Sequence, residues 1–429
     1  MIAALFRLGL EQADTLRARL LDWAHSPAAL DDWALGYGPL AQWAVGQPWI
    51  GFVVVIGVCA IATATAAWMV RQLAPQASGS GIPHVEAVIH GDAPPGPYAL
   101  VPVKFIGGIL AIGSGLALGR EGPSVQMGAG IATFISRLGQ RGFPDSRVLM
   151  AAGAGAGLAT AFNAPLAGAI FVLEELVQRY EPRIAIAALG SSITAISVSR
   201  AILGDSPDFT VAQLTYPPLA VQVLFLGLGL VSGLLAVAYN ITVLGTLGLA
   251  DRLGRIPVEA RGALIGAAVG VLAWFHPALV GGGDPLTQQM LLGGAAALPV
   301  AAAFAVRFVL GAVSYAAMTP GGLFAPMLTL GAQSGLMFGI ACQTGLPGLE
   351  IQPEGFALVG MAAFFAGVVR SPVTGLILVG EMTHNVALLL PMVGACFTAM
   401  LVPALLRNMP IYESLRERAA QQMEAGRSR

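Results

Sequence analysis

Long apolar stretches interrupted by glycine and proline run through most of the chain. The region from Gly262 to Leu406 contains only six charged side chains. A helix that crosses a bilayer needs about 20 mainly apolar residues. Ile50–Val70 meets this need, with Trp49 and Arg71 at its ends as expected at a membrane interface. The pattern predicts an all-α polytopic membrane protein, the region 50–412 forming one transmembrane domain.

The two ends of the chain are more polar. Residues 1–49 mix Arg7, Glu11 and Asp14 with Leu and Ala, which predicts an amphipathic helix lying on the membrane surface. The order of residues expected of a cleavable signal peptide is missing here. Residues 413–429 form a short polar C-terminal tail. We expect both termini in the cytoplasm.

Blocks rich in glycine and proline occur twice in the same order. The second set follows the first at offsets of 202, 203 and 207 residues. The chain therefore consists of two homologous halves, about 50–250 and 255–410, joined near Asp251–Arg261. The matched prolines are Pro83, Pro123 and Pro165 in the first half and Pro285, Pro326 and Pro372 in the second.

Repeated breaks in hydrophobic segments indicate the binding site of a transporter. A helix that begins within the membrane exposes its first N–H groups and the positive end of its dipole, which together suit an anion. The alternative is that these glycines and prolines only allow close packing of helices.

Glu121 lies inside one of these breaks. An ionisable group within a membrane segment indicates function, because its charge is costly there. A carboxylate beside a helix N-terminus takes the place of an anion, and protonation removes its claim to that place. Such a residue can exchange a bound anion for a proton. The structural alternative is that Arg120 simply neutralises Glu121.

Glu174 and Glu175 follow an apolar run and point about 100 degrees apart on a helix, so they cannot share one role. Glu381 matches Glu174 in the repeat, which leaves Glu175 as the specialised residue and a candidate for a buried proton path. The alternative is an ordinary solvated helix end near Arg179.

Three further residues offer uncharged ligands. Ser80 supplies a hydroxyl donor, which suits a halide that must leave as easily as it arrives. Phe324 lies in the matching break of the second half and adds backbone N–H groups and an apolar wall. Tyr412 follows the last apolar run, where an interfacial tyrosine is the alternative.

Other classes of function fit poorly. The net charge of −1 gives no indication of a nucleic-acid partner. The histidines are scattered, so we expect neither a metal site nor a metalloenzyme, and no serine nucleophile motif occurs. The three cysteines lie in apolar sequence and predict free thiols. Lys104 is the only lysine and thus the one candidate for a lysine-based anion site.

Four motifs in this order resemble the CLC family of chloride channels and transporters. They are Gly-Ser-Gly-Ile-Pro at 79–83, Gly-Arg-Glu-Gly-Pro at 119–123, Gly-Leu-Phe-Ala-Pro at 322–326 and the late Tyr412. The resemblance implies a homodimer in a prokaryotic inner membrane, with two halves of inverted topology, a helix-broken anion site at the centre and no cofactor. The nucleotide-sensing domains of many family members have no counterpart in the 17 residues after Tyr412.

The resemblance also implies a role for each site residue. Ser80, Tyr412 and the backbone N–H groups of Leu323 and Phe324 would bind the central chloride. Glu121 would be the gating glutamate and Glu175 the internal proton acceptor. The N–H groups of Arg120 and Gly122 would bind an outer ion. We expect a chloride/proton antiporter, the alternatives being a passive chloride channel of the same fold or an exchanger for another small anion.

Overall fold

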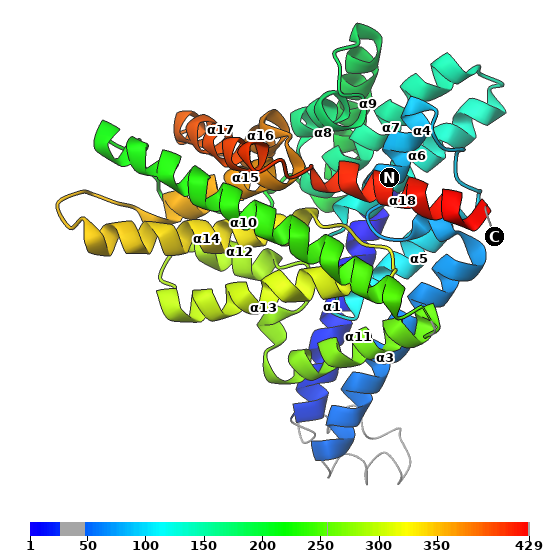
Figure 1. Ribbon diagram of the computed structural model, residues 1–429, viewed down its shortest axis with the longest axis horizontal. Helices are drawn as coiled ribbons and strands as arrows, with labels where there is room; N and C mark the ends of the chain where they lie inside the picture. The colour runs from blue at the N-terminus through cyan, green and yellow to red at the C-terminus, as the bar shows by residue number, and fades with distance from the viewer. Residues whose placement is uncertain (26–47, 255, 428–429) are drawn as a thin grey trace.

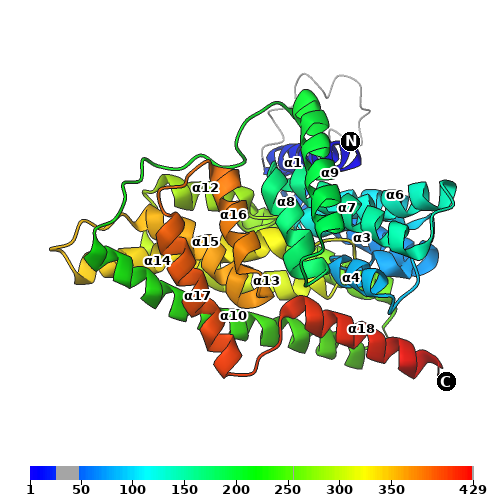
Figure 2. The same ribbon diagram turned by 90° about the horizontal axis from the view of Figure 1, so that it is seen from above.

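The apolar runs fold into helices of unequal length, packed at varied angles around a common centre (Figures 1 and 2). This computed structural model describes residues 1–25, 48–254 and 256–427. The first half contains α1 (Ile2–His25), α3 (Pro48–Leu73), α4 (Ile82–His90), α5 (Leu100–Gly113), α6 (Glu121–Leu138), α7 (Phe143–Phe162), α8 (Pro165–Phe171), a π-helical turn η4 (Val172–Leu176) and α9 (Pro182–Leu203). The second contains α10 (Leu219–Arg252), α11 (Val258–Phe275), α12 (Asp284–Leu292), α13 (Ala297–Tyr315), α14 (Phe324–Gly345), α15 (Pro353–Val369), α16 (Pro372–Thr383), α17 (Leu389–Leu405) and α18 (Ile411–Arg427).

The membrane prediction is confirmed by these helices. Six of the described helices are long and apolar enough to cross a bilayer. One of them, α3, contains the span predicted at Ile50–Val70. Others are too short to cross alone, including α4, α8 and α12. Short helices that end within the protein are what the glycine and proline breaks predicted.

The repeat is visible in the starts of the helices. The pairs α4 and α12, α6 and α14, and α8 and α16 each begin at the matched motifs. Helix α9 of the first half corresponds to α17 of the second. At the start of each half, α1 and α3 correspond to α10 and α11. These bounds place the junction of the halves in residues 204–218. The predicted junction near Asp251–Arg261 is therefore displaced, because the long α10 opens the second half.

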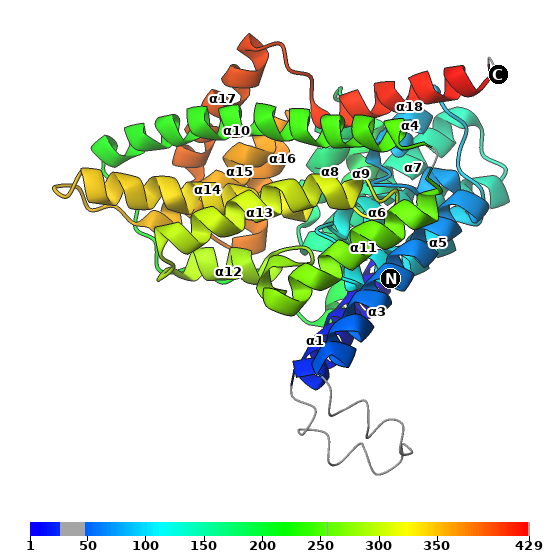
Figure 3. The ribbon, with the colours of Figure 1, turned by 60° about the horizontal axis from the view of Figure 1, so that its bottom comes forward.

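Helix α1 differs from the helix expected on the membrane surface. It lies beside α3 and contacts α5 and α6 (Figures 1 and 3). Phe6 is fully buried, and its ring lies tilted against that of Phe105 at a centroid distance of 5.6 Å. Its apolar face therefore packs on protein instead of lipid. The rest of the predicted segment, residues 26–47, lies outside the described residues, and the side of the membrane on which the N-terminus lies stays a prediction.

The C-terminal segment is a helix and not a separate tail. Helix α18 begins at Ile411, so Tyr412 and the polar residues after it share one rigid element. It extends along α4 and the end of α10 (Figure 2).

Two buried cations hold the glycine-rich loops at equivalent places in the two halves. The Lys104 ammonium donates hydrogen bonds to the carbonyls of Ala77, at 3.0 Å, and Gly79, at 2.7 Å. Its counterpart in the second half is Arg307 of α13, which donates hydrogen bonds to the loop before α12. These groups satisfy backbone carbonyls that no helix can satisfy at this depth. Arg307 donates to the carbonyls of Leu279, Gly281 and Gly282 at 2.7–3.0 Å.

We predict that Lys104→Met destabilises the protein by about 3 kcal/mol, because two buried carbonyls lose their donor. The melting temperature of the purified protein, followed by tryptophan fluorescence, measures the effect. Arg71→Gln is the control: this side chain is half exposed and pairs with Glu259 on the surface, so its loss changes stability by about 1 kcal/mol or less. Equal melting temperatures for the two variants would contradict the role of Lys104.

Candidate anion-binding site

The two halves meet where Gly119 and Gly322 cross. The N–H of Gly119 donates to the carbonyl of Gly322 at 2.7 Å, and the N–H of Gly322 donates back at 2.8 Å. These residues occupy equivalent positions of the repeat, so the reciprocal pair lies on the axis that relates the halves. A second link joins the Ser80 loop to this crossing, since the N–H of Gly321 donates to the carbonyl of Gly79 at 3.0 Å.

The crossing brings together the starts of three helices, α4, α6 and α14. A Cβ at Gly122 would lie 2.9 Å from Cα of Ser80, and one at Gly322 would lie 3.1 Å from the nitrogen of Gly122. Only glycine allows the three segments to approach so closely. The first N–H groups of these helices and the positive ends of their dipoles therefore face a small common region, which favours an anion.

The predicted hydroxyl ligands, Ser80 and Tyr412, lie in this region. Both side chains are fully buried. Neither hydroxyl has a hydrogen-bond partner within the described part of the chain, although the two lie close to each other. Buried hydroxyls normally have a partner. Within the described residues, both hydroxyls are therefore free to donate to a ligand.

Leu323 and Phe324 occupy the start of α14, as predicted. Leu323 is the N-cap residue and Phe324 the first residue of the helix. The buried Phe324 ring packs between three other phenylalanines, which gives the site the expected apolar wall. The ring centroids of Phe162, Phe171 and Phe365 lie 5.4, 6.0 and 4.4 Å away.

Glu121 is the first residue of α6 and is only 1% exposed. Its carboxylate faces its own N–H and that of Ala325 in α14. Within the residues described, Oε2 has no hydrogen-bond partner. The carboxylate thus lies at the starts of two helices at once, where an anion would be held.

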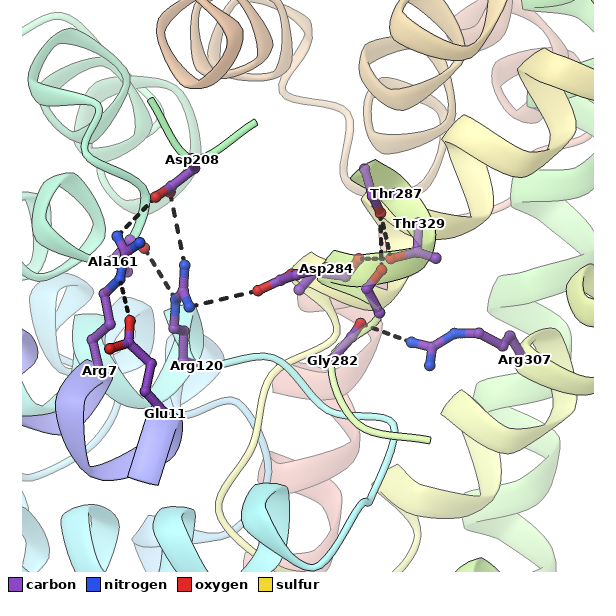
Figure 4. A network of polar contacts seen from close by, with 12 residues as sticks. Arg7, Glu11, Arg120, Ala161, Asp208, Gly282, Asp284, Thr287, Arg307 and Thr329 are labelled. Atoms are coloured by element: carbon purple, nitrogen blue, oxygen red, sulfur yellow. Dashed lines mark hydrogen bonds and ion pairs between the residues drawn. The ribbon is translucent and has the colours of Figure 1, made fainter. Parts of the chain in front are cut away.

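Arg120 forms no ion pair with Glu121 within the described residues, although its charge still acts on the Glu121 carboxyl. Its guanidinium points the other way, toward the carbonyl of Ala161 at 3.2 Å, Asp208 at 3.7 Å and Asp284 at 3.5 Å (Figure 4). The N–H groups of Arg120 and Gly122 belong to the first turn of α6, as the prediction of an outer ion requires.

Asp208 was not predicted as a site residue, and it links α1 to Arg120. Its buried carboxylate lies 2.7 Å from Arg7 and, on its other oxygen, close to Arg120 (Figure 4). A cavity of about 240 Å³ lies here, and its lining includes Ala325, next to the Glu121 carboxylate. The cavity is lined by charged side chains of α1, by Arg120, Asp208 and Asp284, and by apolar side chains, and Glu121 is not part of its lining. No local motif marks Asp208, because its partners lie 88 and more residues away in sequence.

Glu174 and Glu381 form a reciprocal pair of helix caps. Glu174 accepts hydrogen bonds from the N–H groups of Val373, at 3.0 Å, and Thr374, at 2.6 Å, at the start of α16. Glu381 accepts in the same way at the start of α8. This exchange between halves explains why the two glutamates match in the repeat. The α8 donors are the N–H groups of Leu166 and Ala167, at 3.1 and 2.9 Å.

Glu175 has no such task. It is buried in η4 and accepts a hydrogen bond from Ser371. The charges of Glu86, Glu174 and Glu413 act on it, and its own charge acts on the Tyr412 hydroxyl. Glu175 and Glu121 thus both lie within electrostatic reach of Tyr412.

Tyr315 was also missed by the sequence analysis. Its hydroxyl accepts a hydrogen bond from the N–H of Ser80 at 3.3 Å. The bond orients the Ser80 loop from the second half of the chain. Lys104, the one lysine candidate for an anion ligand, instead donates hydrogen bonds to the carbonyls of this same loop.

Comparison with known proteins shows the family to which the chain belongs. The family model described as voltage gated chloride channel matches residues 56–404. The chain belongs to this family, the CLC proteins. It is 40% identical over 357 residues to the H(+)/Cl(-) exchange transporter ClcA of Vibrio parahaemolyticus, covering 82% of this chain and 76% of the relative. It is 37% identical to ClcA of Cronobacter sakazakii over 89% of this chain and 83% of that one.

The fold of this CLC protein is also that of a solved structure. A slow cyanobacterial Cl-/H+ antiporter superposes with a TM-score of 0.83 at 29% identity, covering 97% of both chains. The predicted fold class, an all-α CLC-type membrane fold, is therefore confirmed.

We predict that Gly119→Ala lowers chloride efflux from liposomes about tenfold or more, because misplacing a reacting group by a fraction of an ångström is costly. The added Cβ would strike Oε2 of Glu121 and lie 3.0 Å from the nitrogen of Ala325. The matched control is Gly190→Ala in α9, where no atom lies within 4 Å of the new Cβ. If both variants, monodisperse in gel filtration, transport like the parent, the crowding at Gly119 is irrelevant.

Proposed function

We propose that this protein is a chloride/proton antiporter in which Glu121 is the gating glutamate. One observation carries the proposal. The Glu121 carboxylate lies at the starts of α6 and α14, next to a region that holds the hydroxyls of Ser80 and Tyr412, which have no hydrogen-bond partner in the described part of the chain. Exchange of chloride for protons is the activity named for the relatives from Vibrio parahaemolyticus and Cronobacter sakazakii.

Chloride would be bound without a full positive charge. The hydroxyls of Ser80 and Tyr412 and the N–H groups of Leu323 and Phe324 are neutral donors. Dipoles and neutral donors hold a halide firmly enough for selection and loosely enough for release. The cationic side chains nearby support this reading, because Lys104 and Arg307 are occupied by backbone carbonyls.

Glu121 would couple the two ions by competition. In its charged form the carboxylate occupies the N–H groups at the helix starts and excludes an outer chloride at Arg120 and Gly122. A proton removes the charge, so the side chain yields its place to the anion. One site therefore holds either a carboxylate or a chloride, and each replacement moves a proton.

Glu175 would receive protons from the cytoplasm. Its burial, its bond from Ser371 and its freedom from capping support this role. Glu174, the neighbouring glutamate, is committed to the start of α16 and is a poor candidate.

The setting of the protein is part of the proposal. The membrane spans and the bacterial relatives support a multi-pass protein of a bacterial inner membrane. We place the C-terminal helix in the cytoplasm, because α18 is rich in arginine and arginine favours that side. A homodimer is proposed from the family resemblance. Activity would be transport and not catalysis.

The test is proton movement in liposomes under a chloride gradient with no proton gradient. We predict uphill proton flux driven by chloride. Glu121→Gln and Glu175→Gln abolish proton movement, since each removes the group that carries the proton, and Glu175→Gln still conducts chloride. Chloride flux without proton movement in the parent protein would leave the alternative, a passive channel of the same fold.

Glu381→Gln is the matched control. It removes the same charge from a glutamate whose carboxylate only caps α8. It should lower the melting temperature and keep the parent's ratio of chloride to protons. A loss of coupling here equal to that of Glu175→Gln would show that the assay reports general damage.

A further inference from the structure

One buried ion pair near the site has no assigned role in the mechanism above, although the charge of its glutamate acts on Glu175. Glu86 in α4 lies 2.8 Å from the Arg416 guanidinium in α18, and its side chain is 1% exposed. The same oxygen, Oε1, accepts a weaker bond from Gln178 at 3.3 Å, while Oε2 has no partner among the described residues. Arg416 is 26% exposed and keeps contact with solvent.

The pair joins the two elements that carry the hydroxyl ligands. Ser80 lies two residues before α4, next to its N-cap Gly81, and Glu86 is the fifth residue of this helix. Tyr412 and Arg416 are four residues apart on α18 and so lie on the same face, about 6 Å apart along the axis. The ion pair thus joins α18, which carries the Tyr412 hydroxyl, to α4, which follows the Ser80 hydroxyl. It lies more than one helical turn away from both hydroxyls.

Near Tyr412, α18 is also held by the buried side chains of Ile411 and Leu415 and by contacts with α15, but these apolar contacts fix no single position along α4. The closest packing partner of α18 is α4. The chain before it is held by Arg370, which donates to the carbonyl of Asn408 at 2.7 Å. Farther along, Arg418 pairs with Asp251 at the end of α10, on the surface. Within the described residues, Glu86–Arg416 is the one ion pair between α18 and α4.

We infer that the Glu86–Arg416 ion pair is a positioning element that fixes α18 on α4 and thereby sets how the Tyr412 hydroxyl stands relative to Ser80 at the chloride site. The inference rests on the proposed function, because it gives the pair a role in chloride binding. Removing a partner lets α18 tilt or slide on α4. The Tyr412 hydroxyl then leaves its optimal position, and the site loses a donor.

The experiment measures chloride affinity by calorimetry on the purified full-length protein. Arg416→Gln and Glu86→Gln should each raise the chloride Kd about five- to tenfold, the effect of losing about one neutral hydrogen bond. Arg416→Lys keeps the charge and should stay within about twofold of the parent. Glu417→Gln, on the exposed face of the same helix, is the control and should leave Kd unchanged.

A double-mutant cycle with Tyr412→Phe separates positioning from general damage. If the pair acts through the Tyr412 hydroxyl, Arg416→Gln adds little once that hydroxyl is gone. An equal loss in both backgrounds would overturn the inference, as would an unchanged Kd in both Arg416→Gln and Glu86→Gln. A lower melting temperature with unchanged Kd would also overturn it, since it indicates a structural role only.

A second measurement does not depend on chloride transport. Spin labels at Asp92 and Gln421, both exposed, report the distance between the end of α4 and α18, in a background without the three native cysteines. Arg416→Gln should broaden the distance distribution and Glu417→Gln should not. Failure of the proposed function would appear as a parent protein that binds no chloride. Failure of the inference would appear as a distribution that Arg416→Gln leaves unchanged.

Discussion

Backbone groups that no helix satisfies, at the depth of a membrane, are the constraint on which this structure depends. The broken segments before α4, α6, α12 and α14 expose carbonyls on one side and N–H groups on the other. Lys104 and Arg307 donate hydrogen bonds to the carbonyls. Where the two segments cross, Gly119 and Gly322 satisfy each other's backbone groups by a reciprocal pair of hydrogen bonds. The N–H groups at the starts of α6 and α14 remain for an anion or for the carboxylate of Glu121. Anion binding follows from the way in which the backbone is satisfied.

The repeat accounts for the scaffold, and its exceptions account for the chemistry. Positions with the same structural task keep a matching residue, as the reciprocal caps Glu174 and Glu381 do. The two glutamates assigned to proton movement have no matching glutamate: the position matching Glu121 is Phe324, and the position matching Glu175 is Met382. The helices of the two halves are thus arranged symmetrically, while the glutamates proposed to carry protons occur in the first half alone. The same comparison separates Glu175 from Glu174, which adjacency in sequence alone cannot do.

Much of the fold and the core of the site could be predicted from sequence because local rules determine them. Apolar length predicted the spans, and glycine–proline breaks predicted the helix starts at Ile82, Glu121 and Phe324. Contacts between distant segments could not be predicted. Asp208 meets Arg7 from the opposite end of the first half, and Arg416 lies 330 residues from Glu86. The packing of α1 was also missed, because an amphipathic helix has the same pattern whether its apolar face meets lipid or protein.

The central claim is that carboxylate and anion share one place at the starts of α6 and α14. Anomalous diffraction from crystals grown in bromide tests it most directly, since bromide replaces chloride and can be located by its own signal. The account predicts a peak beside Ser80, Tyr412 and Phe324 in the parent protein. In Glu121→Gln it predicts an additional peak at the N–H groups that the carboxylate faces. A Glu121→Gln structure with no anion at those groups, and the glutamine still in place, would contradict the account.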